Sequence, residues 1–241
     1  MISKIYDASE DNIFTMSPKG QEKKDLFILL SRTHTIPSKI IRALNPMPYA
    51  HASIAFDENL SEMYSFARKR VHYPFYCGLI DEDINKGVYG RKKSTECLVL
   101  RLPVSKEVYQ KAHDYVEGFK ARRRLYGYNY LGVLAVKFHK AFDRKYAFFC
   151  TQFVEKVLQV SGINLFDKKP GLVTPEDYRT CEKLDHFYEG LLSNYRTWLA
   201  GFRCGREANV ASQRGEVRKL RDQKNYRWKE KDRHPEHAGT A

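Results

Sequence analysis

The feature that most constrains this chain is a short aromatic run that leads directly into a cysteine. Within residues 146–158, Cys150 follows two phenylalanines and opens a segment whose apolar residues recur at one-face helical spacing. Ser161 and Gly162 then form a typical helix stop. The pattern predicts a helix that begins at Cys150. A thiol at a helix N-terminus loses its proton more readily than elsewhere, so Cys150 is a candidate nucleophile.

The 241 residues are enough for one large core or two small ones, and the net charge of +13 is unevenly spread. We expect a polar lead-in over residues 1–24, a main domain over residues 25–200 and a basic tail over residues 201–241. The tail holds eleven Lys/Arg against six Asp/Glu. Such a charge favours an anionic partner, although basic residues that only keep the protein dissolved fit the composition equally well.

The five cysteines are odd in number and form no C-x-x-C spacing, which argues against a disulfide framework and a zinc site. We therefore expect no metal and no cofactor, and a reducing, cytoplasmic setting. The N-terminal residues show no apolar signal-peptide region, and no apolar run is long enough to predict a transmembrane helix.

Hydrophobic patterning predicts a mixed order of strands and helices. Strands are expected over residues 26–30 and 96–102, and residues 49–56 and 62–67 predict a hairpin around the turn 57–60. Helices are expected over residues 105–122 and 130–139, after Cys150, and after Thr174, which is followed by proline and two acids. This order favours an α+β fold over a doubly wound parallel sheet.

Thiol chemistry also needs an imidazole and a polar group that orients it. His51 is the best base candidate because it lies near the start of a predicted strand, between Ala50 and Ala52, which leave access. The other histidines fall in expected loops, helices or the tail. In the predicted hairpin Ser65 lies opposite His51 or next to it, whereas Glu62 lies too far along the strand. Ser65 is therefore the predicted orienting residue.

A thioester mechanism further needs donors for an oxyanion. The backbone N–H of Cys150 is one candidate, because it would lie at a helix start. Tyr49, Thr151 and Gln152 flank the two predicted catalytic residues in the sequence and are candidates for contacts with the oxyanion or the substrate. The alternative for the whole set is structural, since a cysteine in an aromatic run is commonly a small buried apolar residue.

Four segments together resemble one known family. They are Tyr49-Ala-His-Ala-Ser-Ile-Ala-Phe-Asp, Met63-Tyr-Ser-Phe-Ala-Arg-Lys, Phe148-Phe-Cys-Thr-Gln-Phe-Val and Leu172-Val-Thr-Pro-Glu-Asp. In this order they look like the circularly permuted branch of the NlpC-type papain-like cysteine hydrolases, over roughly residues 24–195. The resemblance implies an α+β papain-like fold, with a small antiparallel sheet packed against helices, Cys150 as nucleophile and His51 as base. Members often carry a carboxylate or amide where this chain has Ser65.

The expected function is cysteine-dependent hydrolysis of an amide or peptide bond through a thioester, on a peptide, amide or lipid substrate. One alternative is acyl transfer to or from lipid, since enzymes like lecithin:retinol acyltransferase share the permuted arrangement. The other is a non-catalytic protein that binds anionic partners through its basic surface. The sequence does not set the oligomeric state.

Overall fold

The computed structural model describes residues 22–33, 47–70, 73 and 76–206. The chain divides into two compact units, Met1–Ser193 and Asn194–Ala241. Most of the expected lead-in and tail, and residues 34–46 with His34, lie outside the described residues. In the second unit, residues 195–206 form a helix along which the rings of Tyr195, Trp198 and Phe202 stack. The expected domain end at residue 200 therefore falls inside this helix.

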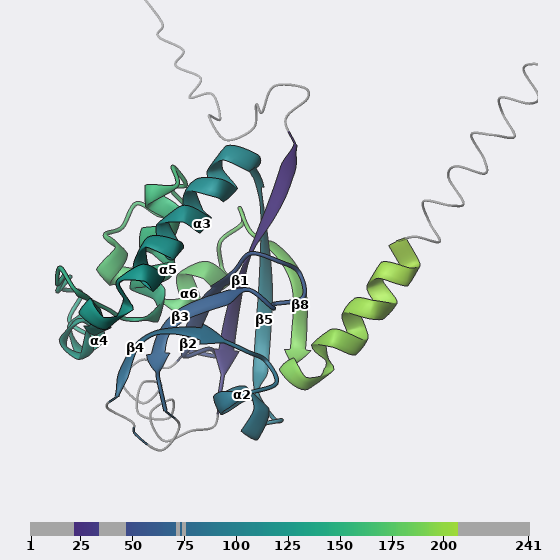
Figure 1. The fold of residues 1–241 in the computed structure, drawn as a ribbon, viewed down its shortest axis with the longest axis horizontal. Coiled ribbons are helices and arrows are strands. Elements are labelled where there is room, and N and C mark those ends of the chain that lie inside the picture. Colours follow the sequence, from purple (N-terminus) through teal and green to yellow (C-terminus); the bar gives the residue numbers. More distant parts are fainter. Residues whose placement is uncertain (1–21, 34–46, 71–72, 74–75, 207–241) are drawn as a thin grey trace, which may run out of the picture. The chain divides into compact units, whose positions relative to one another are not determined.

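A six-stranded antiparallel sheet forms the framework of the first unit (Figure 1). Its strand order is β4-β3-β2-β1-β5-β8, with neighbouring strands antiparallel throughout. The strands are β1 (Lys23–Arg32), β2 (His51–Ala55), β3 (Met63–Arg68), β4 (Cys77–Glu82), β5 (Glu96–Ser105) and β8 (Asp185–Leu191). Two short strands, β6 (Gly127–Tyr128) and β7 (Ala147–Phe148), pair in parallel as a separate ribbon.

The longest pairing joins β1 to β5 along their whole lengths, from Lys23 opposite Ser105 to Arg32 opposite Glu96. β5 was expected to stop before Pro103, yet it continues through this residue. The reason is local: β8 pairs with β5 only as far as Arg101, so Pro103 lies where one side of β5 is an edge. A proline lacks an N–H for the ladder and is tolerated at such an edge.

The helices of the first unit are α2 (Gly87–Arg91), α3 (Lys106–Ala121), α4 (Tyr130–Val136), α5 (Cys150–Val160) and α6 (Pro175–Arg179). Polar side chains cap three of them, because the first N–H groups of a helix lack partners within it. The Ser105 hydroxyl accepts from the Val108 N–H at the start of α3, and Thr174 accepts from the Asp177 N–H at the start of α6. Asn129 caps α4 by accepting from the Gly132 N–H at 2.9 Å.

The main core lies between the sheet and helices α3 and α5, which cover one of its faces (Figure 1). Alternate residues of the central strands, such as Leu26, Ile28 and Leu30 of β1, point into this core and are fully buried. Phe153 of α5 fills its centre, with its ring 5.1 Å from Phe66 and 5.4 Å from Phe119 between centroids. The α+β class expected from the sequence is confirmed.

Two strands of the sheet were not expected. Residues 77–82 read as an apolar stretch followed by an acidic run, but they form β4 at one edge. Residues 185–191 were assigned to a helical region, yet they form β8 at the other edge. Within the described residues, no helix is long and apolar enough to cross a membrane.

Candidate active site

Cys150 is the first residue of α5 and is only 7% exposed. The preceding Phe149 has an extended backbone, so the chain changes from extended to helical conformation at the cysteine. The apolar face of α5 anchors this position: Phe153, Val154 and Val157 are fully buried against the sheet. The side-chain oxygen of Gln152 accepts a hydrogen bond from the Phe149 N–H at 3.4 Å, which satisfies one donor at the helix start.

His51 is the first residue of β2, and its ring contacts a carboxylate. His51 Nε2 lies 2.7 Å from Glu82 Oε1, which comes from the last residue of β4. Glu82 is 8% exposed. Although β4 and β2 do not pair directly, β3 lies between them and brings the two side chains together.

Two serine hydroxyls hold the carboxylate of Glu82. Ser53 Oγ donates to Glu82 Oε2 at 2.8 Å, and Ser65 Oγ donates to Glu82 Oε1. Both serines are fully buried. Ser65, predicted to orient His51, thus acts on Glu82, and the group that contacts the imidazole is a carboxylate. The pairing register explains the difference: β3 pairs with β2 through Ile54 opposite Tyr64, which places Ser65 along the ladder toward Ser53 and away from His51.

The charges in this cluster support one another. Burial favours the neutral form of His51, but the charge of Glu82 and hydrogen bonds to Cys150 and Glu82 raise the pKa of the ring to about 10. Burial likewise opposes ionisation of Cys150, yet the hydrogen bond and charge of His51 hold the pKa of the thiol below its ordinary value. Backbone N–H groups of Ala52 and Thr151 act on the sulfur in the same direction. The arrangement favours a thiolate–imidazolium pair.

Glu82 completes this chain of charges. Burial acts to raise its pKa, but the charge of His51 and hydrogen bonds from His51, Ser65 and Ser53 hold it below the ordinary value. The buried Tyr89 of α2 lies close to the same carboxylate, and its hydroxyl is 3.0 Å from Ser31 Oγ. An ionised carboxylate with this many donors keeps one orientation, which is what a residue that aligns an imidazole requires.

Tyr128 is close enough to Cys150 for the charge of the sulfur to act on its hydroxyl. It is the last residue of β6 and pairs with Phe148, two residues before Cys150. Burial raises the pKa of its hydroxyl well above the ordinary value, and the negative charge of Cys150 raises it further. The tyrosine therefore stays protonated, and its hydroxyl can donate a hydrogen bond.

The three predicted oxyanion or substrate residues have structural partners. The Tyr49 hydroxyl donates to Glu189 Oε1 at 2.7 Å. Thr151 Oγ1 donates to the Val173 carbonyl at 2.6 Å, so only its backbone N–H faces the sulfur. Gln152 Nε2 donates to Asp143 Oδ1 at 2.7 Å. Their side chains thus hold the framework together.

Glu82 and Tyr128 are the residues that sequence reasoning missed. Glu82 stands in the run Asp81-Glu82-Asp83, which resembles a solvated turn. Residues 77–82 read Cys-Gly-Leu-Ile-Asp-Glu and show no alternation of apolar and polar residues, so no local pattern marks Glu82 as inward-facing. Tyr128 lies among several tyrosines that predict a core or groove wall.

Metal-ligating side chains gather at one other place among the described residues. The ligand atoms of Glu62, His113 and Glu117 lie within 4.8 Å of one another. These groups already have partners, since His113 Nε2 is 2.8 Å from Glu62 Oε1 and Glu117 pairs with Lys120 at 2.5 Å. They are far better explained as an ion-pair network between β3 and α3 than as a metal centre.

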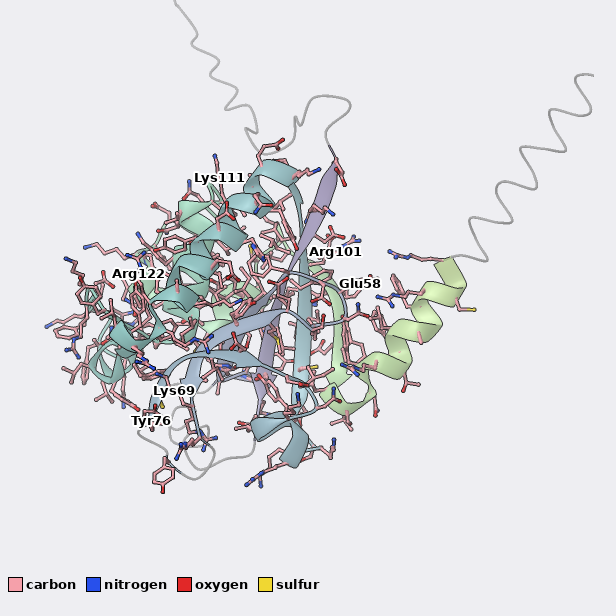
Figure 2. The ribbon with its side chains drawn as sticks, in the orientation of Figure 1. Glu58, Lys69, Tyr76, Arg101, Lys111 and Arg122 are labelled. Carbon is pink, nitrogen blue, oxygen red and sulfur yellow. The ribbon has the colours of Figure 1, made fainter. Side chains whose placement is uncertain are left out.

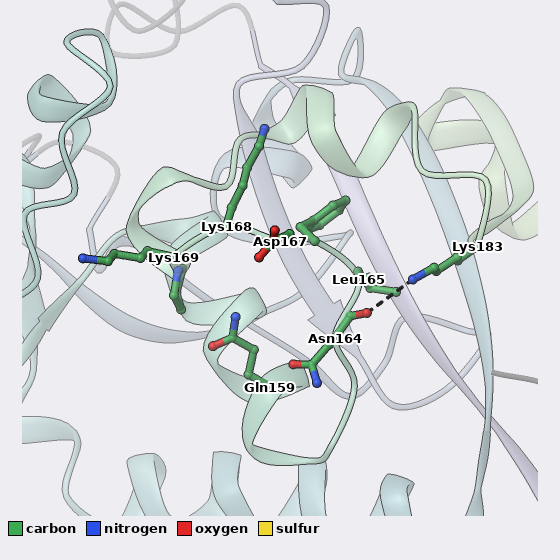
Figure 3. Close-up of a pocket in the computed structure, with 9 residues that line it drawn as sticks. Gln159, Asn164, Leu165, Asp167, Lys168, Lys169 and Lys183 are labelled. Atoms are coloured by element: carbon green, nitrogen blue, oxygen red, sulfur yellow. Dashed lines mark hydrogen bonds between the residues drawn. The ribbon is translucent and has the colours of Figure 1, made fainter. Parts of the chain in front are cut away.

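A cavity of about 770 Å³ opens at the far end of α5 (Figure 3). It is lined by Gln159 of α5 and by the loop that contains Lys168 and Lys169, with Lys183 donating to the Asn164 carbonyl at 3.5 Å across its edge. An eleven-residue helix such as α5 is about 16 Å long, so this cavity and Cys150 lie at opposite ends of it. The cavity is therefore separate from the thiol cluster.

Comparison of the chain with protein families, curated proteins and solved structures finds no match.

Proposed function

We propose that this protein is a cysteine-dependent hydrolase that cleaves an amide or peptide bond through a thioester. The observation that carries the proposal is the continuous chain of contacts from Cys150 through His51 to Glu82. A nucleophile, a base and a group that orients the base are the three parts that acyl transfer needs. The order of the histidine strand before the cysteine helix also agrees with a permuted papain-like fold, which we propose for the first unit.

In the first half of the reaction, the proton of Cys150 passes to His51. Because Glu82 holds Nε2, the ring nitrogen that exchanges the proton is Nδ1. The thiolate attacks the substrate carbonyl carbon, a C–S bond forms, and the carbonyl oxygen becomes an oxyanion. Collapse of this intermediate breaks the C–N bond, and the His51 imidazolium gives its proton to the departing amine.

The second half releases the acid. His51, neutral again, takes a proton from water, and the resulting hydroxide attacks the thioester carbonyl. The C–S bond breaks and the Cys150 thiolate returns, paired with the His51 imidazolium. We assign the Cys150 backbone N–H and the Tyr128 hydroxyl as donors to the oxyanion in both halves, because the first lies at a helix start and the second is a protonated hydroxyl that feels the charge of Cys150.

The experiment uses p-nitrophenyl acetate and a panel of coumarin amides of amino acids, with acyl-enzyme trapped by acid and located by peptide mass spectrometry. We expect an acetyl group on Cys150, and turnover that disappears in Cys150→Ala and His51→Gln. The matched control is Cys204→Ala, which changes an exposed cysteine of the second unit and should leave turnover unchanged. Hydrolysis that survives Cys150→Ala would sink the proposal.

A second candidate is transfer of the acyl group to an acceptor other than water. One observation favours it: the segment immediately before β7 exposes large apolar side chains, among them Leu134 and Phe138. The first half-reaction would be the same, and the two candidates differ in what attacks the thioester. Adding long-chain amines or alcohols during turnover, before any acid quench, separates them, because a transferase forms the new amide or ester faster than free acid.

A further inference from the structure

The segment 130–146, which comprises α4 and the loop that follows it, exposes an unusual number of large apolar side chains. These are Tyr130, Leu131, Leu134, Phe138, Phe142 and Tyr146, with exposed fractions between 40% and 68%. Exposed apolar residues are ordinary when scattered singly, but a contiguous group of this kind marks an interaction site. In the described part of the chain, six of the eleven large hydrophobic residues classed as exposed fall in this one segment.

Basic side chains accompany the apolar ones. Lys137, Lys140, Arg144 and Lys145 are all exposed, while Asp143 is the segment's single acidic residue. Asp143 is exposed and accepts a hydrogen bond from Gln152 Nε2 at 2.7 Å. The preceding turn adds exposed Arg122 and Arg124, whereas Arg123 pairs with Asp81 at 2.8 Å. Figure 2 shows Arg122 and Tyr76 on the side of the first unit where α4 lies.

Hydrogen bonds from Asn129, the residue just before the segment, tie its backbone to the body of the first unit. Asn129 Nδ2 donates to the Phe142 carbonyl at 2.7 Å and to Gln152 Oε1 at 3.2 Å. Gly132 packs so closely on Asn129 that a Cβ there would collide with its side chain. The segment is thus tied to the start of α5, and its outward face combines aliphatic and aromatic groups with flanking lysines. This pairing is typical of helices that lie in the membrane interface.

We propose that segment 130–146 docks the protein on the surface of an anionic lipid bilayer. Leu131, Leu134 and Phe138 would enter the boundary between headgroups and acyl chains, and Lys137, Lys140 and Lys145 would contact the anionic headgroups. The charge complementarity favours a bilayer over a neutral apolar partner. The exposed aliphatic side chains favour a bilayer over nucleic acid, because binding to bases and phosphates would not require them. Docking here brings Cys150 to the lipid surface, since Gln152 and Asn129 join the segment to α5.

The test is co-sedimentation of the full chain with vesicles of phosphatidylcholine alone and of an equimolar mixture with phosphatidylglycerol. We expect binding to the anionic vesicles only. Replacing Lys137, Lys140 and Lys145 with glutamine should weaken binding about fivefold for each lysine. Leu131→Gln, Leu134→Gln and Phe138→Gln together should weaken it more than about tenfold. All six positions are exposed, so the variants should fold, which circular dichroism checks.

Matched controls use exposed residues of the same kinds elsewhere in the first unit. Val160→Gln with Leu191→Gln removes apolar surface, and Lys92→Gln with Lys111→Gln removes charge. Neither control should weaken vesicle binding by more than about twofold, a limit that includes the small effect of the lost net charge.

A fluorescence reporter tests insertion directly. The native tryptophans, Trp198 and Trp228, lie outside the segment, so Phe138→Trp places a new fluorophore in it. Its emission should shift to shorter wavelength with anionic vesicles. Equal binding to neutral vesicles, binding that survives the apolar variants, or a reporter that stays in water would each overturn the proposal. The proposal would also be overturned if the protein fails to bind vesicles but binds duplex DNA. In that case, replacing the lysines would weaken DNA binding and the apolar changes would leave it unaffected.

Discussion

Glu82 Oε1 lies 2.7 Å from His51 Nε2, although the two residues belong to strands that do not pair and are separated by 31 positions in the sequence. The charge of Glu82 lets a partly buried imidazole carry a proton, and together with hydrogen bonds to Cys150 and Glu82 it raises the pKa of His51 to about 10 despite burial. Since the imidazolium in turn lowers the pKa of Cys150, the carboxylate acts on the nucleophile through the histidine.

The first prediction separates Glu82 from Ser65 as the group that orients His51. Glu82→Gln keeps the shape of the side chain but removes its charge, and we expect a loss of turnover of about 100-fold or more. Ser65→Ala removes one of the two serine donors to Glu82 and should cost less than about tenfold. Ser53→Ala is its matched control, because it removes the other donor. Steady-state kinetics with one ester substrate measure all three variants. A larger loss in Ser65→Ala than in Glu82→Gln would contradict the assignment.

The second prediction concerns Tyr128. Tyr128→Phe removes only the hydroxyl, so the ring should still pack beside Tyr130, whose centroid is 4.8 Å away. If the hydroxyl stabilises the oxyanion, kcat should fall about 100-fold with little change in KM, because the lost contact belongs to the transition state. The rate of Cys150 alkylation should stay within about twofold. Tyr130→Phe is the matched control, and an equal fall in kcat there would remove Tyr128 from the mechanism.

The third prediction is a pH dependence of stability that arises at Glu155. This residue of α5 is fully buried, and burial raises the pKa of its carboxyl to about 7, although Tyr178 and Gln159 donate hydrogen bonds to it. A raised pKa means that the folded state binds the proton more tightly than the unfolded state. The group therefore destabilises the fold progressively as pH rises from about 4.5 to about 7, by about 3 kcal/mol in full.

Glu155→Gln removes the titrating group and should remove this loss. Urea unfolding at about pH 5 and about pH 8 checks the sign: the variant should gain stability relative to the native chain at the higher pH. Glu176→Gln, at an exposed helix pair with Arg179, serves as the control. A stability difference between variant and native protein that is the same at both pH values would contradict the assignment.

The fourth prediction tests the core that positions the thiol. Phe153 is fully buried between Phe66 and Phe119, so Phe153→Ala should lower the free energy of unfolding by about 3–5 kcal/mol. Val160 lies in the same helix but is 45% exposed, so Val160→Ala should change the free energy of unfolding by less than about 0.5 kcal/mol. Chemical denaturation measures both. Similar costs at the two positions would show that α5 does not pack as described.

Local patterns in the sequence were enough to place the residues that begin elements. Cys150 at a helix start follows from the apolar periodicity behind it, and His51 at the start of a strand follows from the hairpin pattern. Helix α3 follows in the same way, with Ser105 as its cap. Each of these depends on residues within a few positions along the chain.

The third member of the site depends on long-range pairing, which local patterns do not contain. Glu82 reaches His51 only because β4 pairs with β3 in one register, with Ser65 opposite Ile80 and Met63 opposite Glu82. Eight residues connect these strands, so the register is not set by a two-residue hairpin turn. Strand β8 was missed for a related reason: it is a half-exposed edge strand, whose pairing with β5 includes a register shift after Val99.

The most direct test of the central claim is the pH dependence of alkylation at Cys150. Iodoacetamide reacts with thiolates, and peptide mass spectrometry follows each cysteine of the chain separately, with exposed Cys204 as an internal reference. Buried Cys97, where burial raises the pKa to about 12, should remain unreactive. We predict that Cys150 reacts with a midpoint well below that of Cys204, and that Glu82→Gln and His51→Gln both move it upward. A Cys150 midpoint at or above that of Cys204, unaffected by either change, would contradict the account.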